Sequence, residues 1–350
     1  MNVLIKQGER SQQVADVQAR LRALRYEIDD EPGHFGPSTL RAVRAFQQAR
    51  GILNDGIVGP NTWNELVEAS WRLGDRILYI RHPLMRGDDV ATLQGRLNAL
   101  GFDSGREDGI FGPDTARAVR AFQREYGVDE DGIFGPNSHA ALVGLRIDRP
   151  GTAAFLREEL RIAEHPGLHD AVIVIDPAHG GHDPGHRGPN GIAEADVCWD
   201  ISRRLAQRLS AFGARVRLTR TEAECPDETT RARRANQLDA DLFLSIHLNA
   251  HEEGNADGAS TYYFRTSRAG ERLAEFIQQE IVSLGVRDCR AHPRSYTVLR
   301  ETRMPAVLVE PSFITNAEAE KRLEQVEFRA AVADAVAVAL HHYYEAVPAA

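Results

Sequence analysis

Two copies of one segment occupy the first part of the chain, and this duplication restricts that part to a pair of similar small modules. A shift of 76 positions aligns the copies without a gap, and residues 41–47 match residues 117–123 letter for letter. Self-similarity of this kind is the signature of repeated structural units. We therefore expect one module at residues 1–70 and a second at residues 84–147 of the 350-residue chain.

Each copy also contains a shorter internal repeat built on a Gly-Pro turn. Phe35-Gly36-Pro37 recurs 23 residues later as Val58-Gly59-Pro60, and the second copy has the same spacing. Gly-Pro before a helical pattern predicts a tight turn followed by a helix with Pro near its first position. Valine, leucine and phenylalanine then recur every three or four residues. Each module is therefore predicted to be a small all-α bundle of three helices, without residues suited to catalysis.

The repeated pattern resembles the peptidoglycan-binding module of bacterial cell-wall hydrolases, over nearly the whole of both copies. It reads V-x-x-(V/L)-Q-x-R-L-x-A-L and then G-x-F-G-P-x-T-x-x-A-V-x-x-F-Q. The resemblance implies peptidoglycan, both glycan strands and stem peptides, as the partner. The alternative is that these residues are scaffold and indicate the fold rather than a retained ligand. Trp63 and Tyr26 of the first copy become His139 and Phe102 in the second, so the two copies need not bind equally well.

From residue 169 onward, strands alternate with helices. Apolar runs predict strands at residues 171–176, 215–219, 241–246, 260–264 and 306–310. Helical spacing predicts helices at residues 194–212, 268–284 and 327–344, and a connecting helix at 152–165 before this region. The alternation predicts an α/β domain at residues 169–350, with an open, mostly parallel sheet and helices on both faces.

Polar side chains follow the predicted strands at the positions where α/β proteins build their sites. His179 follows the first strand, His247 and Glu310 end two others, and Glu194 opens a helix after a Gly-rich loop. The carboxyl ends of such strands lie along one edge of the sheet, so three of these residues are expected to converge. Two imidazoles and a carboxylate suit a catalytic zinc ion, which activates water, and a second carboxylate can carry protons. Topology leaves open which glutamate has which role.

Several segments of this region resemble the zinc-dependent N-acetylmuramoyl-L-alanine amidases, and the match spans about residues 171–344. The segments are IDPAHGGHDPGHRGPNGIAEAD, LTR, RARRAN, ADLFLSIHLNA and MPAVLVEPSFITN. The resemblance implies that His179, Glu194 and His247 bind Zn2+ and that Glu310 is the catalytic glutamate. It also implies the reaction, in which zinc-activated water cleaves the amide bond between N-acetylmuramic acid and L-alanine of peptidoglycan.

The chain departs from the family pattern at a few positions. Ala178 stands where the family usually has glycine, and Leu248 and Pro311-Ser312 also differ from the commonest forms. None of these changes removes a ligand, but Ala178 would tighten the loop if its position requires a positive φ. The stretch between Phe264 and Leu273 is too short for the blocking helix of some regulated relatives, so we expect an open site.

Other polar residues of this region are interpreted as loop residues or as residues that support the site. Three histidines are interpreted as loop residues: His182, His186 and His251. The alternative for His182 is an HxxH pair with His179. Asp176 either orients a metal ligand or caps the loop. Three further residues are predicted to position the backbone: Arg231, Arg234 and Asn236.

Composition limits the remaining classes of function. A net charge of −9 argues against nucleic acid as a partner, because nucleic-acid binders usually carry a basic face. Cys198, Cys225 and Cys289 are scattered and form no CxxC pair, which argues against a disulfide framework or a thiolate zinc site. The N-terminus lacks the apolar stretch of a signal peptide, and no run is long enough to span a membrane.

The lack of a signal peptide motivates a rival to the enzyme, which as a hydrolase would act at the bacterial cell wall. The rival is a non-hydrolytic, cytoplasmic binding protein that regulates peptidoglycan synthesis. A zinc peptidase on the same scaffold is a third hypothesis.

Overall fold

The computed structural model describes residues 4–145 and 167–346, and the predicted helix at 152–165 lies outside these ranges. The described residues fall into two compact units, which correspond to the repeated modules and to the α/β region.

The N-terminal unit contains two bundles of three helices each, as predicted from the repeats. The bundles are formed by α1 (Gln12–Ala23), α2 (Pro37–Arg50) and α3 (Pro60–Glu68), and by α4 (Asp88–Ala99), α5 (Pro113–Tyr126) and α6 (Pro136–Val143). Proline occupies the first turn of α2, α3, α5 and α6, which confirms the prediction from the Gly-Pro turns. Each bundle has its own apolar core, with Phe35 and Phe46 fully buried in the first and Phe111 and Phe122 in the second.

A buried glutamine holds each of the four turn loops of this unit in the same way. The Gln47 amide donates to the Ile57 carbonyl at 3.0 Å, and its oxygen accepts the N–H of Gly56 at 2.8 Å. Gly56 has a φ of +78°, which a residue without a Cβ adopts at little cost. The same pair of interactions with a loop glycine and a loop carbonyl recurs at the other three glutamines: Gln18, Gln94 and Gln123. The two loops that are held in this way within each copy lie 23 residues apart, which explains the spacing of the internal repeat.

Replacing Gln47 by leucine is expected to destabilise the first bundle by ~1–3 kcal/mol, because buried groups of the loop lose their partners. Gln47 is fully buried, whereas its neighbour Gln48 is exposed and serves as the matched control. Hydrogen–deuterium exchange should accelerate in α2 and α3 of Gln47→Leu and remain unchanged in Gln48→Leu. Equal protection in both variants would show that the hydrogen bonds of the Gln47 side chain contribute nothing to the stability of the bundle.

The C-terminal unit is built on one six-stranded sheet, in the order β2-β1-β3-β6-β4-β5. Its strands are β1 (Val172–Pro177), β2 (Arg215–Leu218), β3 (Leu242–Ile246), β4 (Ala259–Tyr263), β5 (Asp288–Pro293) and β6 (Ala306–Glu310). All neighbouring pairs are parallel except β4 and β6, which are antiparallel. The prediction of a mostly parallel sheet is confirmed.

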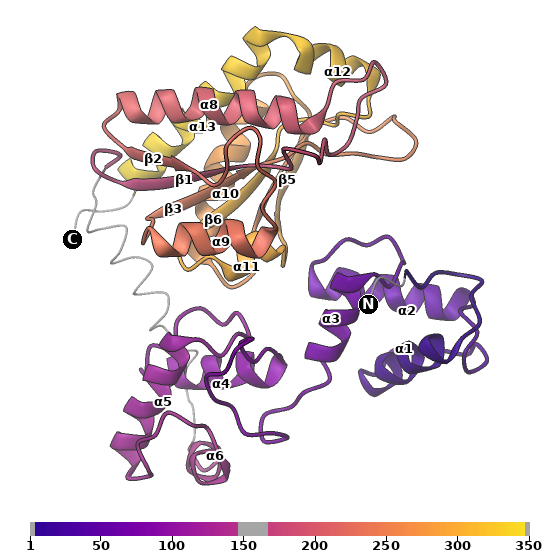
Figure 1. Cartoon of the computed structure of the whole chain (residues 1–350), viewed down its shortest axis with the longest axis vertical. Helices are drawn as coiled ribbons and strands as arrows, with labels where there is room; N and C mark the ends of the chain where they lie inside the picture. The colour runs from indigo at the N-terminus through magenta and orange to yellow at the C-terminus, as the bar shows by residue number, and fades with distance from the viewer. Residues whose placement is uncertain (1–3, 146–166, 347–350) are drawn as a thin grey trace. The chain divides into compact units, whose positions relative to one another are not determined.

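Helices cover both faces of this sheet (Figure 1). The helices are α8 (Glu194–Ala211), α9 (Glu228–Gln237), α10 (Arg268–Val282), α11 (Thr297–Glu301), α12 (Ala317–Glu324) and α13 (Val326–Glu345). Successive side chains of a strand point to opposite faces. Ile173 and Ile175 accordingly join a core with α8, α10 and α13, while Val174 between them joins a core with α9 and α11. Burial on both faces explains the continuous apolar runs of β1, β3 and β6.

One strand was not predicted from the sequence. β5, with the sequence DCRAHP, lies at an edge of the sheet and is largely exposed or only partly buried. Edge strands carry polar and charged residues that discourage pairing with other chains, so β5 lacks the apolar run that reveals a central strand.

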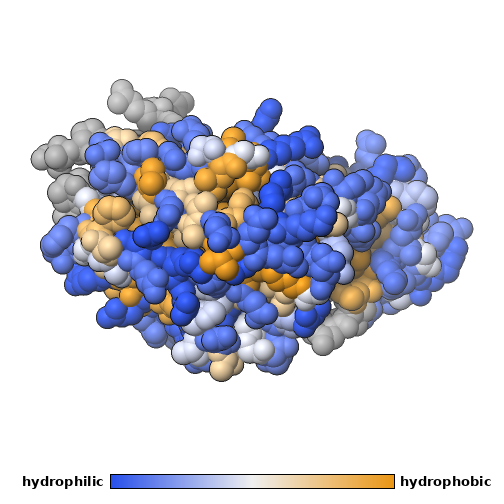
Figure 2. Space-filling model, turned by 90° about the horizontal axis from the view of Figure 1, so that it is seen from above, coloured by the Kyte–Doolittle hydropathy of each residue, from blue (hydrophilic) through white to orange (hydrophobic). Residues whose placement is uncertain are grey.

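The visible surface is mainly hydrophilic, with apolar residues in small patches between polar ones (Figure 2). Among the residues that the structure describes, none of the helices combines the length and the apolar character needed to cross a bilayer.

Candidate active site

The carboxyl ends of three adjacent parallel strands bring together three of the predicted site residues. Pro177 of β1 pairs with Ile246 of β3, so His179 and His247 follow neighbouring strand ends. The backbone N–H of His247 donates to the carbonyl of Val309 at 2.9 Å, which places His247 beside the end of β6 and Glu310. The convergence expected from topology is therefore present.

Glu194 reaches the same edge from the first turn of α8. Its side chain is 1% exposed, and each carboxylate oxygen accepts a backbone N–H. Oε1 accepts from Leu248 at 3.0 Å, and Oε2 accepts from His186 at 3.0 Å. The carboxylate is thereby fixed between the strand end after β3 and the Gly-rich loop.

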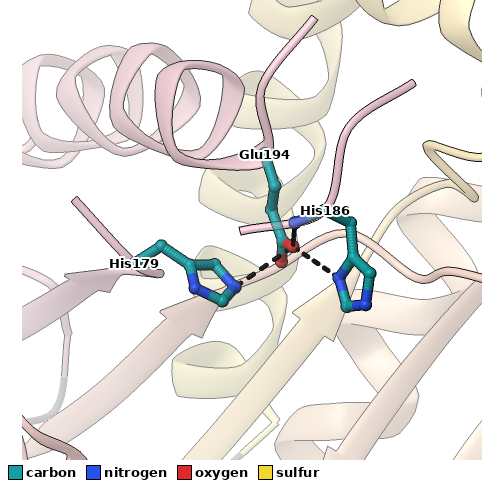
Figure 3. A group of neighbouring side chains, drawn as sticks. All are labelled: His179, His186 and Glu194. Atoms are coloured by element: carbon teal, nitrogen blue, oxygen red, sulfur yellow. Dashed lines mark hydrogen bonds and ion pairs between the residues drawn. The ribbon is translucent and has the colours of Figure 1, made fainter. Parts of the chain in front are cut away.

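Three histidine rings surround this carboxylate. Nε2 of His179 lies 3.1 Å and Nδ1 of His186 lies 2.9 Å from Oε2 of Glu194, and the three donor atoms lie within 4.8 Å of one another (Figure 3). Nδ1 of His247 lies 3.4 Å from Oε1. His186 was interpreted from the sequence as a loop residue, and the structure shows that it lies at the site. The one sequence feature that indicates this location is the position of His186 in the Gly-rich loop between His179 and Glu194.

Hydrogen bonding within the cluster shifts the pKa values of its members. Burial lowers the pKa of His179, but hydrogen bonds to Glu194 and Asp183 outweigh this effect and raise it to about 9. The hydrogen bond to Glu194 raises the pKa of His186. Burial raises the pKa of Glu194, but hydrogen bonds to the three imidazoles hold it well below its usual range. Glu194 is therefore held in its ionised form.

Asp183 orients the ring of His179, a role that was missed in the sequence. Its Oδ2 lies 2.7 Å from Nδ1 of His179, and its Oδ1 accepts the N–H of Gly185 at 3.0 Å. A carboxylate on one ring nitrogen fixes the tautomer and directs the other nitrogen, Nε2, toward the site.

A buried ion pair holds the backbone of His179. His179 has a φ of +53°, which is uncommon for a residue with a Cβ. Arg231 donates to the carbonyls of Pro177 at 2.6 Å and of His179 at 2.7 Å, and it pairs with Asp176 at 2.9 Å. Asp176 thus anchors Arg231 rather than a ligand ring, and the prediction that Arg231 positions backbone is confirmed.

Among the residues of this loop other than glycine, His179 has a positive φ, and Ala178 is not strained in that way. The departure from glycine at Ala178 therefore leaves the loop unchanged in this respect. Gly185 does require the absence of a side chain, because a Cβ there would lie 2.5 Å from His179 and 2.8 Å from Glu194. His182 and His251 are exposed, as expected of loop residues.

Glu310 is a second carboxylate of the site with a different environment. Oε2 accepts a hydrogen bond from the hydroxyl of Tyr262 on the antiparallel neighbour β4, at 3.1 Å. Burial raises the pKa of Glu310 to about 7, against the opposing effects of His247 and Tyr262. One glutamate is thus held ionised and the other is poised to gain and lose a proton near neutral pH.

The donor set fits a divalent ion of the zinc type. Imidazole nitrogens and a carboxylate are the ligands that zinc takes in hydrolytic sites. The donor atoms of His179, His186 and Glu194 lie within 4.8 Å of one another, and the second nitrogen of His179 has the carboxylate partner that oriented metal ligands usually have.

An open α/β sheet with a histidine and glutamate cluster at its strand ends, joined to two helical repeats, is the arrangement of a modular hydrolase. The N-acetylmuramoyl-L-alanine amidase family model matches residues 173–342, and the putative peptidoglycan binding domain model matches residues 10–66 and 86–142. The N-acetylmuramoyl-L-alanine amidase CwlM of Mycobacterium tuberculosis is 41% identical over 360 residues, covering 96% of this chain and 88% of the relative. The chain belongs to the N-acetylmuramoyl-L-alanine amidases.

Other relatives match about half of the chain. The amidase LytC of Bacillus subtilis is 39% identical over 175 residues, which are 49% of this chain and 35% of LytC. A crystal structure of an N-acetylmuramoyl-L-alanine amidase from Clostridium difficile 630 matches with 32% identity and a TM-score of 0.50, covering 51% of this chain and all of that chain. The resemblances stated from the sequence are confirmed: the protein is a peptidoglycan amidase with peptidoglycan-binding repeats.

Proposed function

We propose that this amidase uses a zinc ion, held by His179, Glu194 and His247, to hydrolyse the bond between N-acetylmuramic acid and L-alanine, with Glu310 as its catalytic residue. The observation that carries this proposal is the contact of three imidazoles with the buried carboxylate of Glu194 at the edge of the sheet where Glu310 ends its strand. When bound, zinc polarises a substrate carbonyl and lowers the pKa of water toward ~7.

The other side chains of the site transfer protons or hold the reacting groups in position. Glu310 accepts a proton on its carboxylate and delivers it to the departing nitrogen, since a group with a pKa near the working pH both accepts and donates protons. The Tyr262 hydroxyl, hydrogen-bonded to Oε2 of Glu310, fixes the orientation of this carboxylate. Asp183 and Arg231 hold the ring and backbone of His179.

The two repeats, at residues 1–70 and 84–147, hold the catalytic domain at 169–350 on the bacterial cell wall. Peptidoglycan presents many equivalent sites, so two linked modules raise the local concentration of the enzyme on an insoluble substrate. The residues to which the proposed chemistry is assigned all lie in the C-terminal unit.

The zinc-loaded full chain is expected to release stem peptides that begin with a free L-alanine amine from purified muropeptides. Mass spectrometry of the digest identifies the bond that is broken, because hydrolysis adds one water at that bond. Cleavage between amino acids of the stem would instead identify a peptidase. A chain that binds zinc and muropeptides but releases no product would be the non-hydrolytic binding protein, and the proposed reaction would be wrong.

A further inference from the structure

His186 shares one oxygen of Glu194 with His179. Its Nδ1 lies 2.9 Å from Oε2 of Glu194, while Nε2 of His179 lies 3.1 Å from the same atom. Both nitrogens therefore point toward the place where the carboxylate would meet a metal ion (Figure 3). With His247 on the other oxygen, the site contains three imidazoles rather than two.

The position of His186 is imposed by Glu194 itself. The N–H of His186 donates to Oε2 of Glu194 at 3.0 Å, and the N–H of Glu194 donates to the carbonyl of His186 at 2.9 Å. Gly185 packs against both His179 and Glu194, so the loop approaches the site without an intervening side chain. Any residue at position 186 would be held close to the carboxylate, and this one carries a metal-binding ring.

The ring itself remains accessible. The side chain of His186 is 58% exposed, compared with 23% for His179 and 25% for His247. It can leave the site by rotating about its side-chain bonds, while the backbone hydrogen bonds to Glu194 stay in place. His179 lacks this freedom because Asp183 and Arg231 hold it.

We propose that His186 is a fourth, displaceable protein ligand of the zinc site, an inference that rests on the proposed function. Four protein donors are typical of closed zinc sites, whereas catalytic sites keep one position open. With an ion bound and no substrate present, His186 would occupy the position that catalytic sites keep open, and rotation of its exposed ring would free that position for a substrate carbonyl. The ion is thereby retained more tightly in the resting protein than by His179, Glu194 and His247 alone.

X-ray absorption spectroscopy of the zinc-loaded full chain tests this proposal by counting imidazoles. We expect three histidines at the metal in the wild type and two in His186→Ala and His186→Gln. Chelator competition should show a zinc Kd raised ~10-fold or more in both variants. Loss of an outer-shell partner alone raises a metal Kd ~10–100-fold, so loss of a direct ligand should cost at least the lower of these values. His182→Ala, which removes an exposed histidine of the same loop, should leave the histidine count and the Kd unchanged.

Two histidines in the wild-type spectrum would overturn the proposal. A weaker Kd in His186→Ala would then reflect only the lost hydrogen bond to Glu194, since that bond changes affinity without changing the ligand count. A wild-type chain that binds no zinc would contradict the proposed function instead, so the two failures are distinguishable.

Discussion

Replacing Glu310 by glutamine is expected to lower kcat by ~10²–10⁴-fold, the range that one general acid–base residue contributes. Glutamine keeps the size of the side chain and can still bond to the Tyr262 hydroxyl, but it neither accepts nor releases a proton near neutral pH. Zinc content should remain stoichiometric, because Glu310 is not among the proposed ligands. Release of stem peptides from muropeptides, measured by mass spectrometry, and metal analysis of the same sample check both parts.

The chain offers a matched control for this variant. Tyr263, the next residue of β4, donates to Glu271 at 2.7 Å, and the alternation of the strand directs it to the opposite face from Tyr262. Glu271→Gln therefore removes a tyrosine-bonded carboxylate outside the site and should retain wild-type kcat. A fully active Glu310→Gln would remove Glu310 from the mechanism.

The same assignment predicts how activity depends on pH. Glu310 must be ionised to accept a proton, so kcat/KM should fall as the pH drops through its pKa. Burial raises that pKa to about 7 in the metal-free protein, and a neighbouring cation lowers it. The acidic limb of the wild-type profile is therefore expected at or below about pH 7, and Glu310→Gln should lose it.

Replacing His247 by alanine is expected to weaken zinc binding strongly, although His179, His186 and Glu194 remain, and to reduce hydrolysis with it. Loss of a direct ligand should raise the zinc Kd beyond the ~10–100-fold that loss of an outer-shell partner costs. His247 follows β3, a fully buried strand whose packing does not depend on the imidazole, so the fold should survive. Metal analysis after gel filtration and circular dichroism measure the two outcomes.

His251→Ala is the control, because His251 is an exposed histidine on the loop after the same strand. It should keep one zinc per chain and full activity. Tight zinc binding by a folded His247→Ala would show that His179, His186 and Glu194 hold the ion without it, and the proposed ligand set would be wrong at this position.

Local patterns account for the parts of the fold that were predicted correctly. The Gly-Pro turns mark where α2, α3, α5 and α6 begin, because Pro at a first helical turn is a property of a few adjacent residues. The apolar runs of β1, β3 and β6 reflect burial on both faces of the sheet. β5 is exposed at an edge and left no such run.

The positions of His179, His247 and Glu310 at the carboxyl ends of predicted strands were also enough to predict that they would meet, since these strand ends share one edge of the sheet. The roles of the His186 ring and the Asp183 carboxylate were not predicted, and for Arg231 the sequence predicted a backbone-positioning role without its partners. Their roles depend on the path of a loop whose His179 has a positive φ, and Arg231 stabilises that path from a helix 52 residues further along the chain. Periodicity and spacing describe neighbours along the chain, so only the folded structure decides contacts that are made by a loop and a distant side chain.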